Sequence, residues 1–428
     1  MKIQSIKFIE HPAFLENSRI EFFRARDSSV PKIFFLVGNN GEGKTSILET
    51  ICAGFITNNK SPEQFKASIC VSDEEIIITR NQNNYSTGLS TKGIPFYYDT
   101  LETTFTVEKI STVTGQTIDY DNEPKEKSIN LAQIIPQLLV DISNQDSSFI
   151  AEKSRQGILH KDLDAQELKF TRFTNTLNKI YNGSKRFKTL RNNTELIFED
   201  ANNNECDINS LSTGEKQILF RIGGMLKNLT HLRGSVILID EPETSLHPKW
   251  QQKYVQILLE TFKDLDTQFI IATHSPYVLQ GVKDGESVCI KVDRTKMRIG
   301  EQVGYYPNSI KNPSINLINY LAFDLYDELL HIELFEAILK KESLEFHEID
   351  GFLACRDVEK RSFVTVRNRV RRDGGITLSA GTNLSETLPV YIRNAIHHPE
   401  ETGRVFTNSN SGDSNDLKQS IEIMLSLL

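Results

Sequence analysis

Pro31-Lys-Ile-Phe-Phe-Leu-Val-Gly-Asn-Asn-Gly-Glu-Gly-Lys-Thr45 is the stretch of this 428-residue chain that decides the fold. Its nearly continuous apolar run up to Val37 predicts a strand buried on both faces, as in the centre of an α/β sheet. A glycine-rich loop follows at once, and residues 46–55 then repeat their apolar side chains with helical spacing. Strand, glycine loop and helix in this order are the setting that a phosphate-binding loop requires.

The residue types of this loop suit the phosphates of ATP and a magnesium ion. Glycines let backbone N–H groups turn towards the β- and γ-phosphates without interference from Cβ atoms. Lys44 is expected to place its charge on the γ-phosphate, and the Thr45 hydroxyl is expected to coordinate Mg²⁺. The predicted nucleotide contacts of the loop are Gly38, Asn39, Asn40, Gly41, Glu42, Gly43, Lys44, Thr45 and Ser46.

A second apolar strand, Val236-Ile-Leu-Ile-Asp-Glu241, ends in two carboxylates. Asp240 is predicted to hold Mg²⁺ through water, and Glu241 to polarise the water that attacks the γ-phosphate. An acidic pair after an apolar strand is also common at solvated strand ends, but the phosphate loop upstream favours the catalytic interpretation. We therefore expect ATP hydrolysis, with Lys44 and Glu241 taking part in the reaction.

Leu211-Ser-Thr-Gly-Glu215 resembles the LSxGE/Q signature of the ABC ATPase family, which separates the chain from other phosphate-loop ATPases. In that family the signature begins a helix and contacts the γ-phosphate bound by the partner head. Ser212 can cap the helix that follows, and Gly214 permits close approach of an anion to the positive helix end. The resemblance implies that Ser212, Gly214 and Glu215 bind nucleotide across a homodimer, in an ATP sandwich.

Two further positions continue the resemblance to ABC heads. His274 follows an apolar strand, as the family's switch histidine does, and is expected to sense the γ-phosphate as part of the catalytic set. Ser245-Leu-His-Pro248 resembles the D-loop in the form typical of SMC, RecF and OLD-like heads, which makes His247 a dimer contact rather than a metal ligand. Four candidates remain open for the family's metal-linked glutamine, namely Gln82, Gln116, Gln133 and Gln137.

The resemblance covers about residues 1–305 and implies an α/β fold: an ABC-type P-loop ATPase head with a mixed central sheet and an antiparallel β layer. Alternating residues at 66–80 and about 93–110 are expected to form strands of the antiparallel layer. The head is assigned to residues 1–310, with a helical insert at about 125–195 that is too short for the coiled-coil arm of SMC proteins. Residues 311–428 are predicted to form a small, mainly helical C-terminal domain.

The C-terminal domain contains Arg393, Asn394 and His398, which resemble the Arg-Asn-x-x-x-His element of HEPN domains, many of them metal-independent ribonucleases. The imidazole would exchange protons at a 2′-hydroxyl, the arginine would neutralise the phosphorane, and the asparagine would orient both. A tail that is structural or docks a partner is the alternative, because the match is short. Basic residues that offer a local place for RNA are Lys360, Arg361, Arg367, Arg369, Arg371 and Arg372.

Composition excludes several other classes of protein. With 38% hydrophobic and 25% charged residues, the chain is expected to fold, and no apolar stretch reaches membrane-spanning length. A net charge of −8 and a pI of about 5.7 argue against wholesale electrostatic binding of nucleic acid. The five cysteines lack zinc-like spacing, which favours free thiols in a reducing cytoplasm.

Compact ABC heads of this kind resemble the ATPases of Septu, PARIS and retron antiphage systems. In those families ATP holds a nuclease or toxin in check or senses invasion, so the implied role is a cytoplasmic sensor or switch. The controlled nuclease would be a separate partner protein or the HEPN-like tail. A RecF-like ATPase of DNA repair or recombination is the alternative function, and a transporter ATPase is disfavoured by the Ser-Leu-His-Pro form. RNA and DNA both remain open as ligands, as does assembly above the dimer.

Overall fold

The computed structural model of the chain has two compact units, Met1–Gly304 and Tyr305–Leu428. The predicted domain boundary at 310/311 falls within residues 303–312, outside the described residues. No described helix is long and apolar enough to cross a membrane. The residues that the structure describes are 2–16, 18–22, 30, 32–55, 65–71, 74–81, 84–86, 96–99, 131–163, 167–181, 185–191, 195–227, 234–244, 246–282, 287–292, 301–302, 313–364, 369–370, 377–378, 381–398 and 412–428.

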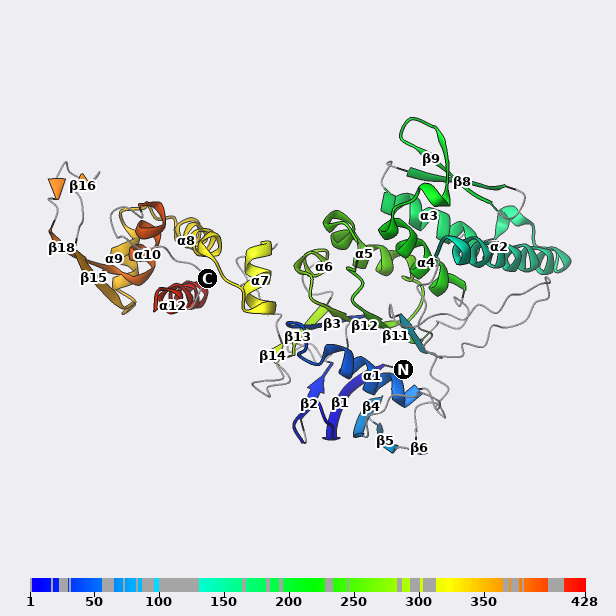
Figure 1. Ribbon diagram of the computed structural model, residues 1–428, viewed down its shortest axis with the longest axis horizontal. Helices are drawn as coiled ribbons and strands as arrows, with labels where there is room; N and C mark the ends of the chain where they lie inside the picture. The colour runs from blue at the N-terminus through cyan, green and yellow to red at the C-terminus, as the bar shows by residue number, and fades with distance from the viewer. Residues whose placement is uncertain are drawn as a thin grey trace. The chain divides into compact units, whose positions relative to one another are not determined.

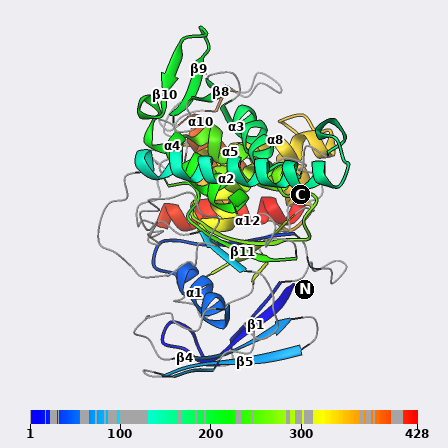
Figure 2. The same cartoon turned by 90° about the vertical axis from the view of Figure 1, so that its right-hand side faces the viewer.

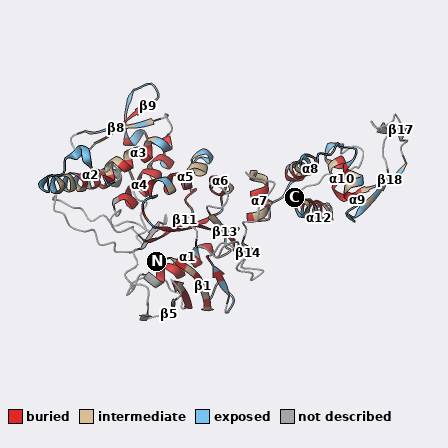
Figure 3. Ribbon diagram, turned by 180° about the vertical axis from the view of Figure 1, so that it is seen from behind, coloured by how far each residue is buried: buried red, intermediate tan, exposed pale blue. Residues whose placement is uncertain are grey.

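The first unit is organised around a mixed six-stranded sheet with the order β14-β13-β3-β12-β11-β7 (Figure 1). Neighbours from β13 to β7 run parallel, and β14 runs antiparallel to β13. The three strands β3, β11 and β12 are buried throughout, as their largely apolar sequences predict (Figure 3). The strands are Ile33–Val37 (β3), Phe96–Asp99 (β7), Val236–Asp240 (β11), Gln268–Thr273 (β12), Ser287–Lys291 (β13) and Glu301–Gln302 (β14).

The register of this sheet brings the ends of three strands to one edge. Val37, the last residue of β3, pairs with Thr273 of β12, and Asp240 of β11 pairs with Ala272. In parallel sheets the carboxyl ends of neighbouring strands share an edge, where ligands commonly bind. The phosphate loop, Asp240 and His274 therefore meet there.

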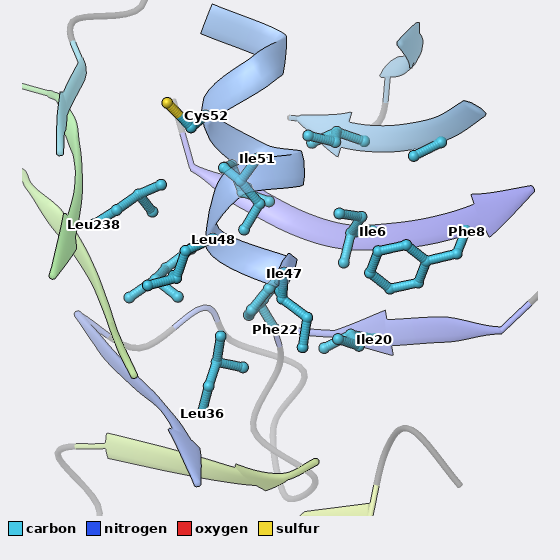
Figure 4. Close-up of a cluster of buried hydrophobic side chains, with 14 of the residues drawn as sticks. Ile6, Phe8, Ile20, Phe22, Leu36, Ile47, Leu48, Ile51, Cys52 and Leu238 are labelled. Carbon is cyan, nitrogen blue, oxygen red and sulfur yellow. The ribbon is translucent and has the colours of Figure 1, made fainter. Parts of the chain in front are cut away.

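Helix α1, Lys44–Phe55, packs between the central sheet and an antiparallel sheet (Figure 2). In Figure 4 its side chain Leu48 lies near Leu238 of the central sheet, with Ile6 of the antiparallel sheet on the helix's other side. Burying each such side chain is worth about 1.5–3 kcal/mol, so this core fixes the helix that follows the phosphate loop. The antiparallel sheet has the order β2-β1-β4-β5-β6, with bounds Ile3–Glu10 (β1), Arg19–Glu21 (β2), Phe65–Val71 (β4), Glu74–Asn81 (β5) and Asn84–Ser86 (β6).

The prediction that residues 93–110 belong to the antiparallel layer is wrong for the part that is described. Phe96–Asp99 (β7) pairs in parallel with β11 and extends the central sheet, while residues 100–110 lie outside the described residues. Alternation reports that one face of a strand is buried, and it carries no information about which strand is the neighbour. The expectation at 66–80 is confirmed by β4 and β5.

The helical insert contains two helices, Leu131–Arg155 (α2) and Lys169–Tyr181 (α3), with a short 3₁₀ helix, His160–Asp162, between them. The insert was predicted to stay helical to about 195, but Lys185–Arg191 (β8) is a strand that pairs with Glu195–Asp200 (β9). β9 pairs in turn with Glu205–Asp207 (β10). The further helices of the unit are Thr213–Lys227 (α4), Pro248–Thr261 (α5) and Pro276–Gln280 (α6).

The second unit is mainly helical, as predicted, and adds two small two-stranded sheets. Its core is built from α8, α10 and α12 and includes Leu334, Ile392 and Ile421. Its helices are Ile315–Phe323 (α7), Glu328–Glu342 (α8), Ile349–Ala354 (α9), Leu388–His397 (α10) and Gly412–Leu427 (α12). These sheets pair Lys360–Val364 (β15) with Asn383–Thr387 (β18) and Arg369–Val370 (β16) with Thr377–Leu378 (β17), both antiparallel.

Candidate nucleotide site

The phosphate loop follows β3 and has a backbone that requires glycine at two tight positions. Gly38 has φ +146°, and a Cβ there would lie 2.6 Å from the carbonyl oxygen of Val292. Gly43 has φ +98°, and a Cβ there would lie 2.9 Å from the Phe14 ring. Residues that carry a Cβ atom rarely adopt these φ values, and neither position has room for a Cβ. The spacing of glycines in the sequence thus reflects close approach of the loop to its neighbours.

Lys44 lies at the start of α1 with its amine turned back over the loop. Its Nζ donates hydrogen bonds to the carbonyl oxygens of Gly38 (2.8 Å) and Asn39 (2.9 Å). Burial lowers the pKa of Lys44, while the carboxylates of Glu241 and Asp240 oppose that change. The other predicted loop contacts are exposed or half-buried, namely Asn39, Asn40, Gly41, Glu42, Gly43, Thr45 and Ser46.

Thr45 and Asp240, which are 195 residues apart in the chain, meet at the sheet edge. The Thr45 hydroxyl donates a hydrogen bond of 3.0 Å to Oδ2 of Asp240. Burial raises the pKa of Asp240 to about 6, and its Oδ1 is buried with no hydrogen-bond partner in the described part of the chain. A buried carboxylate oxygen without a partner is costly and calls for a cation or water.

A carboxylate and a hydroxyl form a donor set of hard oxygens that fits Mg²⁺. Across the described ranges no group of three or more His, Cys, Asp or Glu side chains could hold a metal by itself. Mg²⁺ is commonly bound by one or two protein oxygens together with substrate phosphates and water. The residues present therefore fit a magnesium ion that arrives with the nucleotide.

Glu241 follows Asp240 in a left-handed backbone conformation, with φ 44°. Its N–H donates to the carbonyl oxygen of Ala272 (2.9 Å), and its Oε1 lies 3.5 Å from Nδ1 of His274. A non-glycine residue in this region costs about 1–3 kcal/mol and persists only where its surroundings impose it. The turn brings the predicted water-activating carboxylate and the predicted γ-phosphate sensor to the same point.

Glu243 belongs to this site although the sequence analysis did not select it. Its Oε1 accepts a hydrogen bond of 2.7 Å from the backbone N–H of His274 and lies 3.2 Å from that residue's Nδ1. The side chain is 4% exposed, and its Oε2 is buried with no hydrogen-bond partner within the described ranges. The available signal was a third carboxylate that follows Asp240-Glu241 and precedes the segment interpreted as the D-loop, residues 245–248.

The signature residues lie at the start of α4. The Ser212 N–H donates to Oε2 of Glu215 (2.7 Å), and the Glu215 N–H donates to the Ser212 hydroxyl oxygen (3.3 Å). This reciprocal pair is a capping box, as the predicted capping role of Ser212 requires. Gly214 is buried and Ser212 is exposed. The side chains of Ser212 and Glu215 bond to each other's backbone N–H groups, and the Glu215 carboxylate also accepts from Lys185; none of these bonds reaches the phosphate loop.

His247 and the glutamine candidates complete the predicted head residues. His247 caps α5, its exposed ring accepting from the Lys249 N–H at 3.2 Å. Gln82 and Gln116 lie outside the described residues, as do the side chains of the two α2 candidates, Gln133 and Gln137.

The HEPN-like element of the second unit is at the end of α10. Asn394 is buried and donates from Nδ2 to Oε2 of Glu386 (2.9 Å), which ties α10 to β18. The Arg393 guanidinium lies 4.2 Å from the centre of the Phe346 ring and donates to Oδ1 of Asn394 at 3.5 Å. His398 is the exposed C-cap of the helix. Asn394 is thus engaged inside the fold, while Arg393 and His398 reach the surface.

The basic run upstream of this element is described only in part. Arg361 pairs with Glu359 and, at 2.9 Å, with Asp416, so its charge is compensated within the unit. Lys360 is exposed. Arg367, Arg371, Arg372 and the side chain of Arg369 lie outside the described residues.

Comparison with known proteins defines the class. The profile of the family described as "AAA domain, putative AbiEii toxin, Type IV TA system" matches residues 33–280. That range contains the phosphate loop, the signature, the Asp240-Glu241 pair and His274. The chain belongs to this family and is therefore an ATPase of the phosphate-loop type.

Relatives from two named systems are similar to the chain. The "Retron Vc95 probable ATPase" of Vibrio cholerae serotype O1 biovar El Tor is 30% identical over 179 residues, 40% of this chain and 32% of that protein. The "Retron Ec83 probable ATPase" of Escherichia coli is 34% identical over 125 residues, 27% of this chain and 22% of that protein. The "Septu protein PtuA" of Bacillus thuringiensis is 23% identical over 336 residues, 70% of this chain and 78% of that protein. The chain thus matches a third or less of the length of the two retron ATPases.

Among solved structures, the SMC head domain from Thermotoga maritima is similar with a TM-score of 0.39 and 14% identity. The match covers 69% of this chain and 97% of that domain.

Proposed function

We propose that the protein is a homodimeric ATPase switch of antiphage defence, in which the nucleotide state of the dimer controls a nuclease or toxin. Membership of the AAA-domain family supports ATP hydrolysis, and similarity to retron and Septu proteins supports the defence role. The observation that carries the proposal is the convergence of the phosphate loop, Asp240 and Glu241 at one sheet edge, where Thr45 and Asp240 are hydrogen-bonded.

Hydrolysis at this site follows from the positions of the side chains. The loop amides and Lys44 would bind the β- and γ-phosphates, with Lys44 exchanging its carbonyl partners for phosphate oxygens. Thr45 and Asp240 would hold Mg²⁺, which neutralises phosphate charge when it is bound. Glu241 would accept the proton of a water molecule whose oxygen bonds to the γ-phosphorus as the bond to the ADP oxygen breaks.

A second copy of the chain would complete the site. Ser212 and Gly214 begin a 15-residue helix, whose N-terminal end carries partial positive charge and suits a phosphate. The hydrogen bonds between Ser212 and Glu215 lie away from the phosphate loop of the same chain, which supports a role of the signature in the site of a partner. In this arrangement neither copy hydrolyses ATP alone.

Two variants test the composite site directly. Glu241→Gln keeps every group that binds nucleotide and removes the proton acceptor, so it is expected to accumulate an ATP-bound dimer. Lys44→Ala is expected to lose ATP binding and to stay monomeric. Mass measured by light scattering during size exclusion, with and without Mg²⁺ and ATP, distinguishes these outcomes. A Glu241→Gln protein that binds ATP and remains monomeric would contradict the sandwich.

The partner of the switch would be a nuclease or toxin, and the second unit would be the place where it docks. The bond between Asn394 and Glu386 favours docking over ribonuclease chemistry, because it occupies the amide that the HEPN comparison requires as an orienting group. Purification with the products of neighbouring genes tests docking. Growth arrest on overexpression that disappears with His398→Ala would instead establish the ribonuclease interpretation.

A further inference from the structure

A negative charge lies within the signature, next to the place proposed to receive a triphosphate. The Glu215 carboxylate is 8% exposed and accepts the Ser212 N–H, so it lies one hydrogen bond away from the residue proposed to meet the γ-phosphate. Like charges repel strongly where water is largely excluded. An uncompensated Glu215 would therefore oppose the binding that the helix end favours.

The compensating charge comes from a different strand. Nζ of Lys185, the first residue of β8, lies 3.0 Å from Oε2 of Glu215, the same oxygen that accepts the Ser212 N–H. Lys185 is 21% exposed, so the ion pair is largely shielded from solvent. Lys185 also donates to the carbonyl oxygen of Ser210, just before the signature (3.5 Å). Lys185 thus contacts both the Glu215 carboxylate and the backbone of Ser210, which precedes the signature.

We propose that Lys185 is a positioning residue for ATP hydrolysis: it neutralises Glu215 and fixes the Ser212 cap, so that the start of α4 can accept the γ-phosphate bound by a second copy of the chain. The inference rests on the proposed function and extends it to a residue outside every motif. It also assigns a role to the three-stranded sheet β8–β10, which supplies the charge that the signature needs.

The ion pair has a matched control on the same strand. Lys188 pairs with Glu199 and Glu205, both at 2.8 Å, at a more exposed position. Lys188→Met removes one positive charge from β8, as Lys185→Met does, but leaves Glu215 compensated. A general effect of the charge of β8 would appear in both variants, whereas the proposed effect appears only in Lys185→Met.

Turnover and binding separate a positioning role from a purely structural one. Lys185→Met is expected to lower kcat roughly tenfold to a hundredfold, the range for loss of a charge-assisted hydrogen bond that matters in the transition state. Its ATP affinity, measured at protein concentrations too low for dimers, should stay unchanged because the phosphate loop is intact. Lys185→Arg keeps the charge and should keep most of the activity. Lys188→Met should match the wild-type protein.

Removing the negative charge should rescue the lysine variant. Glutamine at position 215 can still accept the Ser212 N–H through its carbonyl oxygen, and it carries no charge. Glu215→Gln in the Lys185→Met background is therefore expected to restore kcat to within about threefold of the Glu215→Gln single variant. A double variant that stays as slow as Lys185→Met would overturn the proposed neutralisation.

Mixed dimers test whether Lys185 of one chain affects hydrolysis of the ATP bound by the phosphate loop of the other chain. A Lys185→Met chain paired with a Lys44→Ala chain retains one intact composite site, and its rate should equal that of a dimer of wild-type and Lys44→Ala chains. A chain carrying both substitutions, paired with a wild-type chain, has no intact site and should be at least tenfold slower. Equal rates for the two arrangements would overturn the assignment in trans.

A further variant separates failure of this inference from failure of the proposed function. Ser212→Arg should abolish hydrolysis at retained ATP affinity if the signature acts on a partner's nucleotide. If Ser212→Arg is inactive while Lys185→Met is fully active, the lysine assignment is wrong and the composite site stands. If both variants hydrolyse ATP normally, the composite site itself is wrong.

Discussion

Replacing Asp240 with asparagine should stabilise the nucleotide-free protein while destroying its activity. The carboxylate is 8% exposed, its Oδ1 lacks a hydrogen-bond partner within the part of the chain that is described, and burial raises its pKa from 3.8 to about 6. At 1.36 kcal/mol per pKa unit, this corresponds to about 3 kcal/mol of folding free energy lost at neutral pH. Asparagine removes the charge and keeps a carbonyl oxygen to accept the Thr45 hydroxyl. The variant should therefore be more stable at pH 7 by up to about 3 kcal/mol.

The sign of the pH dependence follows from the raised pKa. The folded state holds the Asp240 proton more tightly than the unfolded state, so wild-type stability falls as the pH rises from about 4 to about 6. Below pH 4 the carboxyl is protonated in both states and carries no penalty. The free energy of unfolding of Asp240→Asn should thus exceed that of the wild-type protein by the full amount at pH 7, and the two values should become equal near pH 4.

Urea unfolding followed by tryptophan fluorescence measures this difference in the first unit alone. The single tryptophan, Trp250, lies on α5, so its signal reports the unit that contains Asp240. The samples should contain EDTA and no nucleotide. The surface substitution Glu152→Gln is the control and should change the free energy of unfolding by less than about 0.5 kcal/mol. Equal stability of Asp240→Asn and wild type at pH 7, or a gap that widens towards pH 4, would refute the reasoning.

Two further predictions concern the neighbours of the phosphate loop. Gly43→Ala places a Cβ 2.9 Å from the Phe14 ring and should lower the unfolding free energy by about 2–4 kcal/mol and weaken ATP binding; Gly157→Ala, with a similar left-handed φ and open space, should cost only about 1–2 kcal/mol. Calorimetric ATP titration and urea unfolding check both, and equal losses in the two variants would contradict the clash. Glu243→Ala removes the acceptor of the His274 N–H and should lower kcat roughly tenfold to a hundredfold at unchanged ATP affinity. Glu243→Gln keeps that acceptor and should retain most of the turnover, and an equally slow glutamine variant would show that the charge matters instead.

The sequence predicted the candidate nucleotide site in outline from local patterns alone. Each of its parts is a short strand followed at once by the residue that carries the chemistry, as in Val37 before the loop and Ile239 before Asp240. Parallel strands align their carboxyl ends, so consecutive motifs of this kind meet without further information. In the structure, the register of β3, β11 and β12 brings these strand ends to one edge of the sheet, and the roles of their residues in ATP binding and hydrolysis stay predictions.

The same local patterns gave wrong or incomplete answers where a residue's role depends on a partner far away in the chain. Strand β7 was placed in the antiparallel layer, because alternation identifies a strand and not its neighbour. Glu243 was missed because it acts on His274, 31 residues further on. Lys185 was missed because its partner Glu215 is 30 residues away.

The sequence by itself determined the class of protein, because phosphate binding needs particular residue types at fixed short spacings that no other function requires in that order. Tertiary structure alone decided which charges are compensated and which are left buried, since Coulomb energy depends on distance through space and on exclusion of water. The HEPN-like element illustrates the difference: its spacing suggested a catalytic asparagine, whereas folding places Asn394 in the interior, bonded to Glu386.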